Sequence, residues 1–109
     1  GHLAWSGDDP LEMARAHAKR IRHVHLKDIR PDVIARGTAG SLSFQESIME
    51  GAFTVPGDGA IDFRPILQTL ADADFSGWLV VEAEQDPARA NPLDHARKAR
   101  DYLRGIIGF

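Results

Sequence analysis

Apolar residues recur at helical spacing in three stretches of the chain. Residues 10–20, 61–73 and 92–107 each place apolar side chains three or four positions apart, which is typical of helices with one buried face. Asp9 stands directly before the first stretch and Asp62 lies at the start of the second. Both carboxylates can cap free backbone amides, so the sequence predicts three major helices.

Two other stretches predict parallel strands. Residues 21–29 alternate in period two, so that His23, His25 and Lys27 share one face. Residues 78–84 contain a continuous Leu-Val-Val run, which favours a strand buried on both faces. The resulting order of helix, strand, helix, strand, helix predicts an α/β fold with parallel strands and right-handed crossovers.

A long connection joins the first strand to the second major helix. It spans residues 30–60 and is expected to hold one helical turn near its start, a short helix from Ser43 through Met49, and a turn at VPGDG. Ser43 and Glu46 have the spacing of a capping box. An ordinary connection between strand and helix has about 2 to 6 residues, so this length indicates a functional elaboration.

The predicted elements are too few for a complete sheet. Two parallel strands cannot close a barrel, and an isolated two-stranded sheet is marginally stable. Either a further strand comes from the ends of the chain, or the 109 residues are a piece of a larger α/β protein; we favour the second, and we expect no domain boundary inside residues 1–109. The opening GHLAW begins abruptly with apolar residues, as though a strand preceded Gly1.

Composition removes several classes of function. Lys and Arg number 13 against 16 Asp and Glu, and the resulting net charge of -3 argues against a nucleic-acid partner. No stretch approaches the roughly 18 to 20 apolar residues of a membrane span, and no signal peptide is visible, so we expect no membrane partner and a cytoplasmic location. Because the chain has no cysteine, its chemistry must come from His, Asp and Glu.

Candidate metal ligands lie where the two strands end. Parallel α/β sheets carry their sites at the carboxyl ends of the strands, where His25 ends the first strand and Glu82 and Glu84 end the second. Neighbouring strands are about 4.8 Å apart, so His25 and Glu82 could reach one cation, with Mn, Co, Fe or Zn suiting their donors. The alternatives are an ordinary strand histidine, and an ion pair between Glu82 and Lys27 or Arg30.

Residues beside His25 offer further contacts. Lys27 and Asp28 point to opposite faces, so one can face the site while the other braces a loop or a helix terminus. Arg30 could clamp a polar substrate, although a solvated loop arginine is the commoner case. His23 lies one pleat deeper than His25 and is expected in the layered interior of a barrel.

Other polar residues receive no catalytic role. Gly57-Asp58-Gly59 is far shorter than a phosphate-binding loop, and a tight turn is the better interpretation. His17 and His95 lie on predicted helices, where we expect exposed side chains.

The segments HVHLKDIRPDV, FTVPGDGAIDF and GWLVVEAEQDP resemble the C-terminal part of the inosose dehydratases, within the xylose isomerase-like TIM-barrel superfamily. The resemblance spans essentially the whole chain and implies the last third or so of a single barrel domain, and VVEAEQDP with GDG-IDF is more specific than the HLKD strand alone. It implies a (β/α)8 barrel with one divalent metal, Mn or Co, held by Glu, Asp, His and Glu from four strand ends. By position, His25 is the His ligand and Glu82 the final Glu ligand; the other two ligands lie outside this sequence.

The resemblance also implies a reaction. Such an enzyme is a lyase that removes water from 2-keto-myo-inositol in inositol catabolism, through a metal-stabilised enolate. Glu82 would share in the proton transfer as the catalytic residue. His2, Arg30 and Lys27 are the candidates for substrate binding, although the spacing of Arg30 from His25 departs from that in related epimerases.

Two other functions stay open. A sugar or ketose isomerase or epimerase of the same superfamily would use the same enolate and return the proton elsewhere. Alternatively, the chain is a non-catalytic fragment. Because the expected fold leaves strand edges and inner helix faces exposed, we expect the chain alone to be inactive and to associate with copies of itself.

Overall fold

The computed structural model describes residues 1–108, apart from the side chains of residues 38 and 41. Along the chain the elements are α1 (His2–Ser6), α2 (Pro10–His17), the 3-10 turn η1 (Ala18–Arg20), β1 (His23–Leu26), β2 (Asp28–Ile29), α3 (Pro31–Arg36), the turn η2 (Gly37–Ser41), α4 (Phe44–Met49), β3 (Phe53–Thr54), α5 (Phe63–Asp72), β4 (Trp78–Val81) and α6 (Pro92–Ile107). None of the helices found in residues 1–108 has both the length and the apolar character needed to cross a bilayer.

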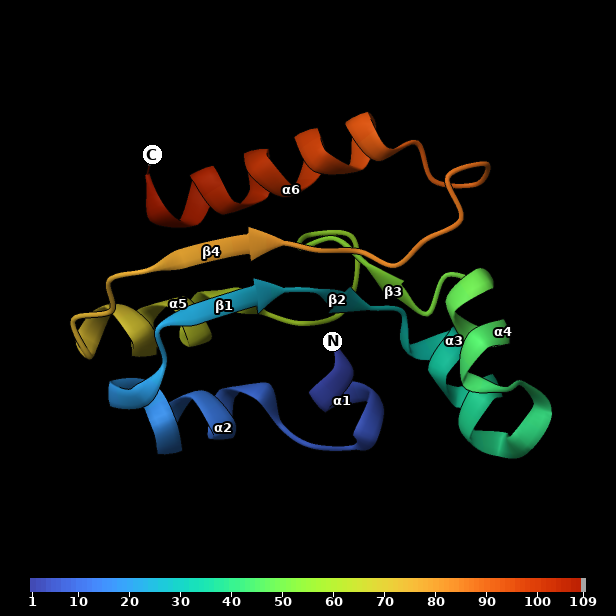
Figure 1. The fold of residues 1–109 in the computed structure, drawn as a ribbon, viewed down its shortest axis with the longest axis horizontal. Coiled ribbons are helices and arrows are strands. Elements are labelled where there is room, and N and C mark those ends of the chain that lie inside the picture. The colour runs from blue at the N-terminus through green and yellow to red at the C-terminus, as the bar shows by residue number, and fades with distance from the viewer. Residues whose placement is uncertain (109) are drawn as a thin grey trace.

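The parallel pair β1 and β4 lies at the centre of the fold (Figure 1). Val24 lies opposite Leu79, and His25 lies opposite Val80. Helix α6 runs beside β4, and α2 runs beside β1. The predicted α/β fold with parallel strands is therefore confirmed.

The major helices begin where their caps were predicted. Asp9 accepts a hydrogen bond from the Leu11 amide at 2.7 Å, and Asp62 accepts one from the Arg64 amide at 3.0 Å. The capping box predicted for α4 is present, with both of its reciprocal hydrogen bonds formed. Helix α6 is capped by Asn91, whose side chain accepts hydrogen bonds from two amides of the first turn. This cap was not predicted from the sequence.

The apolar core lies on one face of the parallel pair. Its buried members come from α2, β1, α5 and α6, and they are Ala14, Leu26, Phe63, Ile66, Leu67, Leu70 and Leu103. Val24 and Leu79 pack against this cluster from their opposed positions in the two strands. Strand alternation therefore directs His23, His25 and Val80 to the other face, which the helices do not cover.

Strand β4 differs from the sequence prediction, which placed it in a buried sheet. The side chain of Trp78 is 75% exposed, and Val81 is also exposed. Over residues 1–108, β4 pairs with β1 alone, so no further strand covers its outer edge. The apolar run fits a strand that is buried in a larger sheet. Residues 1–108 cover only part of the surface of β4.

The predicted strand at residues 21–29 is divided into β1 and β2 at Lys27. Strand β2 turns away to pair in antiparallel fashion with β3, with Ile29 opposite Phe53. The sequence analysis did not predict β3, because a strand of two residues is too short to show alternation. A second apolar cluster forms around this hairpin, from Ile29, Val33, Ala52 and Phe53.

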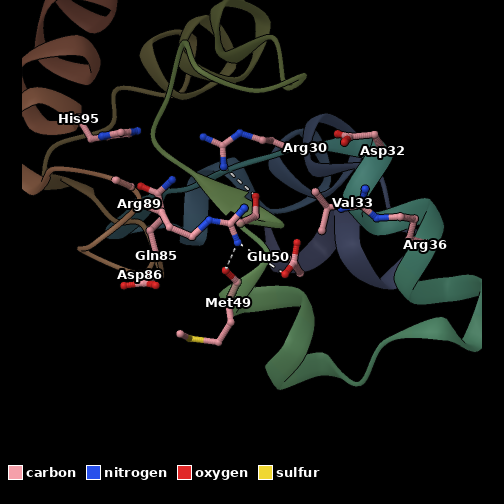
Figure 2. Close-up of a pocket in the computed structure, with 12 residues that line it drawn as sticks. Arg30, Asp32, Val33, Arg36, Met49, Glu50, Gln85, Asp86, Arg89 and His95 are labelled. Atoms are coloured by element: carbon pink, nitrogen blue, oxygen red, sulfur yellow. Dashed lines mark hydrogen bonds and ion pairs between the residues drawn. The ribbon is translucent and has the colours of Figure 1, made fainter.

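The long connection is thus a folded unit with its own small core. Trp5 of α1 packs against it, and helices α3 and α4 flank it beyond the carboxyl end of β1. Between α3, the segment after α4 and the segment that follows β4 lies a cavity of about 420 Å³ (Figure 2). The helical turn, the short helix and the VPGDG turn predicted within the connection are all present.

Asp28 clamps the two ends of this connection. Its buried carboxylate accepts hydrogen bonds from the backbone amides of Ile29 at 2.8 Å, Gly59 at 3.1 Å and Ile61 at 2.8 Å. Gly59 is required for this approach, because a Cβ there would collide with the Asp28 carboxylate and with the Ile29 carbonyl oxygen. As the alternation predicts, Asp28 braces a loop while Lys27 faces the opposite side.

We expect Asp28→Asn to lower the free energy of unfolding by about 1 to 3 kcal/mol, because the amide nitrogen cannot accept and would face a buried amide donor. Urea denaturation monitored by circular dichroism measures the change. Asp32→Asn, at an exposed position in the first turn of α3, is the matched control and should stay within about 0.5 kcal/mol of the parent. Equal effects of the two substitutions would contradict the clamp.

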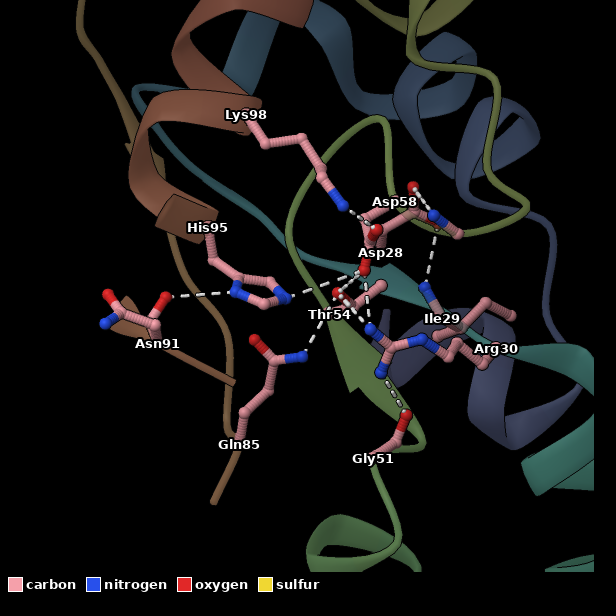
Figure 3. A network of polar contacts seen from close by, with 11 residues as sticks. Asp28, Ile29, Arg30, Gly51, Thr54, Asp58, Gln85, Asn91, His95 and Lys98 are labelled. Carbon is pink, nitrogen blue, oxygen red and sulfur yellow. Dashed lines mark hydrogen bonds and ion pairs between the residues drawn. The ribbon is translucent and has the colours of Figure 1, made fainter. Parts of the chain in front are cut away.

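Asp58 joins three segments that are distant in sequence (Figure 3). Its carboxylate accepts hydrogen bonds from Arg30 at 2.5 Å, from Thr54 at 2.7 Å, and from Lys98 of α6. Partial burial alone would raise the pKa of the Asp58 carboxyl, but the hydrogen bonds from Lys98, Thr54 and Arg30 outweigh it and lower the pKa from 3.8 to about 2. Gly57-Asp58-Gly59 is thus a tight turn, as expected, and Gly57 has a φ of 86°.

This low pKa predicts a stability that depends on pH. Because the pKa of Asp58 is lower in the folded chain than in the unfolded chain, its contribution is fully present above about pH 4 and is lost as the pH falls toward about 2. The contribution is about 2 kcal/mol. The free energy of unfolding of Asp58→Asn should lack this acid dependence, whereas that of Asp101→Asn, which removes an exposed carboxylate on α6, should keep it.

Candidate active site

His25 and Glu82 meet on the open face of the parallel pair. The Glu82 amide donates to the Leu26 carbonyl at 3.1 Å, which continues the strand pairing beyond Val81. Alternation then directs the Glu82 side chain to the same face as His25. His25 Nδ1 donates a hydrogen bond to Glu82 Oε2 at 2.6 Å. The structure therefore brings together the two residues that the sequence analysis named as metal ligands.

Lys27 extends this pair to a second carboxylate. Its side chain is 3% exposed, and Nζ lies 3.4 Å from Glu82 Oε1 and 3.0 Å from Glu84 Oε2. The ring of Phe53 lies 5.2 Å from Nζ and adds a cation–π contact. Burial of an unpaired ammonium would cost several kcal/mol, so the two carboxylates are what allow Lys27 to be buried here.

His2 forms a second histidine–glutamate pair at the same site. Its Nε2 donates to Glu84 Oε2 at 3.2 Å and lies 3.4 Å from Lys27 Nζ. The His2 ring meets the Phe53 ring edge-on, with 4.8 Å between ring centroids. Helix α1 and strand β3 therefore place His2 beside the residues that end β4.

Both carboxylates of the site are held in their charged form. For Glu82, partial burial acts to raise the pKa, but the hydrogen bond from His25 and the charge of Lys27 outweigh it, and the pKa lies below its ordinary value. For Glu84, the hydrogen bond from Lys27 is the largest influence, and with the His2 contact it also lowers the pKa. The site therefore presents two anionic side chains around one buried cation.

The donors at His25 and Glu82 fit part of a metal site. Imidazole nitrogen and carboxylate oxygen are donor types that divalent transition metals prefer. Among residues 1–108, however, no group of three His, Asp or Glu side chains is arranged to hold a metal. If a cation binds here, His25 and Glu82 can supply two of its ligands.

Arg30 lies in a different cluster from His25 and Glu82. Its guanidinium donates to the Gly51 carbonyl at 2.7 Å, to Thr54 at 3.0 Å and to Asp58 at 2.5 Å. These bonds hold the connection against the turn at Asp58. Contact between Arg30 and substrate stays a prediction.

The cavity of Figure 2 lies at this second cluster. Arg30, Arg36 and Arg89 line it together with Gln85 and His95. Arg89 reaches across it to the Met49 carbonyl at 3.0 Å and toward the Glu50 carboxylate at 3.6 Å.

Two residues differ from their predicted roles or surroundings, and a third, His23, lies on the face that strand alternation predicts. His95 was expected to be exposed, but it is half-buried with Nε2 3.8 Å from Asp58, because its helix turns position 95 toward the same side as buried Ala99. Glu84 was placed at the end of the second strand but was assigned no ligand or substrate contact, although its spacing from Glu82 indicates a shared face. His23 shares the face of His25, with 5.2 Å between the ring centroids, and is exposed.

Comparison with known proteins identifies the family of this site. Residues 1–106 match the family of xylose isomerase-like TIM barrels. The inosose dehydratase of Clostridium tetani is 56% identical over 104 residues, which is 95% of this chain and 35% of that protein. Those of Clostridium beijerinckii and Geobacillus thermodenitrificans are 51% and 52% identical over 109 residues, which is 100% of this chain and 37% of each protein.

The chain thus spans about a third of the length of the curated relatives it matches. The identity extends over the whole chain, which includes both strands of the parallel pair and the residues that follow them. The resemblance noted in the sequence is confirmed, and the α/β architecture agrees with part of a barrel. Because the family match covers residues 1–106, the chain belongs to the xylose isomerase-like TIM-barrel family.

Proposed function

We propose that this chain supplies part of the active site of a metal-dependent dehydratase that removes water from 2-keto-myo-inositol. The observation that carries the proposal is the contact of 2.6 Å between His25 and Glu82 across two parallel strands. It occurs in a chain that is 51% to 56% identical to inosose dehydratases. His25 and Glu82 are the proposed metal ligands, with Mn or Co as the metal, and Glu82 is the proposed catalytic residue.

The charges at the site suit the removal of water next to a carbonyl. A divalent cation held by His25 and Glu82 would stabilise the negative charge that develops on a substrate oxygen. Glu82 is anionic at neutral pH, so its carboxylate can accept the proton next to the carbonyl, and the bond to the β-hydroxyl then breaks as an acid protonates that hydroxyl and it leaves as water. His2 and Glu84 form a donor and an acceptor beside it that can contact substrate hydroxyls. Lys27 keeps the carboxylates charged.

The proposal places the chain in inositol catabolism and in the cytoplasm. An isomerase or epimerase of the same family is the second candidate, because it forms the same enolate and returns the proton to a different position. The two reactions differ in product, which gives the test its readout.

A chimera tests the function, because the chain spans a third of its relatives. This chain replaces the matching 104 residues of the Clostridium tetani enzyme, and the product is incubated with 2-keto-myo-inositol and Mn²⁺. We expect the ultraviolet absorbance of the dione product to appear. Glu82→Gln should lower kcat by about 10²- to 10⁴-fold, the range expected for the loss of a general base.

His25→Ala should lower the activity of the same chimera by a similar order. His23→Ala is its matched control, since it removes an exposed imidazole from the same face of β1, and it should leave the activity within a few-fold. Epimerised ketohexose without any dione would favour the second candidate. A folded chimera that makes neither product would contradict the proposed function.

We also propose that the isolated chain associates with copies of itself. In residues 1–108 each strand of the parallel pair is hydrogen-bonded along one side only, and Trp78 and Val81 are exposed on β4. Unpaired strand edges with apolar side chains favour pairing with another chain. A second copy offers such an edge.

We expect size-exclusion chromatography with light scattering to show a dimer or larger species at high concentration. Trp78→Lys with Val81→Lys should shift the mass toward that of the monomer, because charged side chains on an edge strand oppose pairing. Met49→Lys, which replaces an exposed apolar side chain on α4, is the control and should leave the mass unchanged. A monomeric parent chain at every concentration would overturn this proposal.

A further inference from the structure

Three donors that could bind a metal surround a lysine in this site. Lys27 Nζ lies 3.0 Å from Glu84 Oε2, 3.4 Å from Glu82 Oε1 and 3.4 Å from His2 Nε2. The buried ammonium therefore lies among donors of the types that a divalent cation binds.

These distances are those of hydrogen bonds and ion pairs, and they are too long for metal coordination. Carboxylate oxygens and imidazole nitrogens bind transition metals at about 2.0 to 2.2 Å. With Lys27 Nζ among them, the three donors stand 3.0 to 3.4 Å from the position of the cation they share, and the described part of the chain has no three-residue metal cluster. Its positive charge also repels a second cation from the same position.

Lys27 has little freedom to leave this position. Its side chain is 3% exposed, and Nζ lies 5.2 Å from the centre of the Phe53 ring. Its aliphatic stem packs so closely on Gly1 that a Cβ there would lie 2.7 Å from Lys27 Cγ. The Lys27 ammonium is thus a fixed positive charge, held in place by Phe53 of β3 and by the packing of its stem on Gly1, next to α1.

The contacts divide the site into two parts. On one side, Glu82 Oε2 faces His25. On the other side, Glu84 Oε2 receives both Lys27 and His2. Lys27 therefore stands between the proposed metal pair and a second carboxylate that could otherwise join it.

We propose that Lys27 is a positioning residue that keeps Glu84 and His2 out of the coordination sphere of the metal at His25 and Glu82. Glu84 and His2 then stay available as acceptor and donor for the hydroxyls of a polyol or keto-sugar substrate. This inference rests on the metal site of the proposed function. It adds that Lys27 decides which side chains of the site bind the metal.

Direct binding of Mn²⁺ to the 109-residue chain tests the inference without any activity measurement. Loss of the free-ion signal in electron paramagnetic resonance gives the affinity. The parent chain, with two ligands, should bind weakly. Lys27→Met should bind on the order of tenfold more tightly, because it frees Glu84 and removes a repelling charge.

Lys98→Met is the matched control. It removes the same charge from the chain, but Lys98 contacts Asp58, outside this site, so the Mn²⁺ affinity should match that of the parent. Adding Glu84→Gln to Lys27→Met should return the affinity toward that of the parent. Lys27→Arg keeps the charge and should keep the weak binding. A role in packing alone would predict none of these differences.

Circular dichroism melts establish that each variant is folded, and Lys27→Gln gives the same comparison should Lys27→Met fail to fold. A folded Lys27→Met chain with the affinity of the parent, or with no Mn²⁺ binding, overturns the inference. If the parent chain binds Mn²⁺ weakly and His25→Ala abolishes that binding, the proposed metal pair is supported even where the inference about Lys27 fails. Binding that survives both His25→Ala and Glu82→Gln contradicts the proposed pair, whatever Lys27→Met shows.

Discussion

The burial of one ammonium group is the interaction on which the open face of this chain depends. Lys27 follows the last residue of β1 and is covered by Phe53, so its charge is largely removed from water. Such a group is stable only when carboxylates surround it, and the end of β4 supplies Glu82 and Glu84. The register of the two strands thus also sets where anionic oxygen atoms gather.

Strand alternation places the core side chains and the candidate site side chains on opposite faces of the sheet. Val24 and Leu26 pack with the helices, while His25 and Lys27, their neighbours in sequence, face the opposite side. Because each side chain faces only one environment, substitutions among the polar residues leave the core contacts in place. This arrangement suits a barrel family, because a fold can keep its core while the residues of its site vary.

Features set by local spacing and by the strand period were predictable, and features set by irregular contacts between distant segments were not. The helix caps at Asp9 and Asp62 and the contact between His25 and Glu82 follow from local spacing and strand period. The half-burial of His95 depends on a turn that lies far earlier in the chain, and the sequence pattern carries no signal of that contact. The exposure of Trp78 depends on the number of strands in the sheet, because within residues 1–108 β4 has β1 as its one neighbour.

The clamp at Asp28 lets the segment between Ile29 and Gly59 change in length without moving its two ends. Its two ends are fixed to one carboxylate, so their separation does not depend on what lies between them. Lengthening a closed loop costs free energy only as the logarithm of its length. Insertions and deletions can therefore accumulate in this excursion and reshape the mouth of the barrel, while the strand that carries His25 keeps its place.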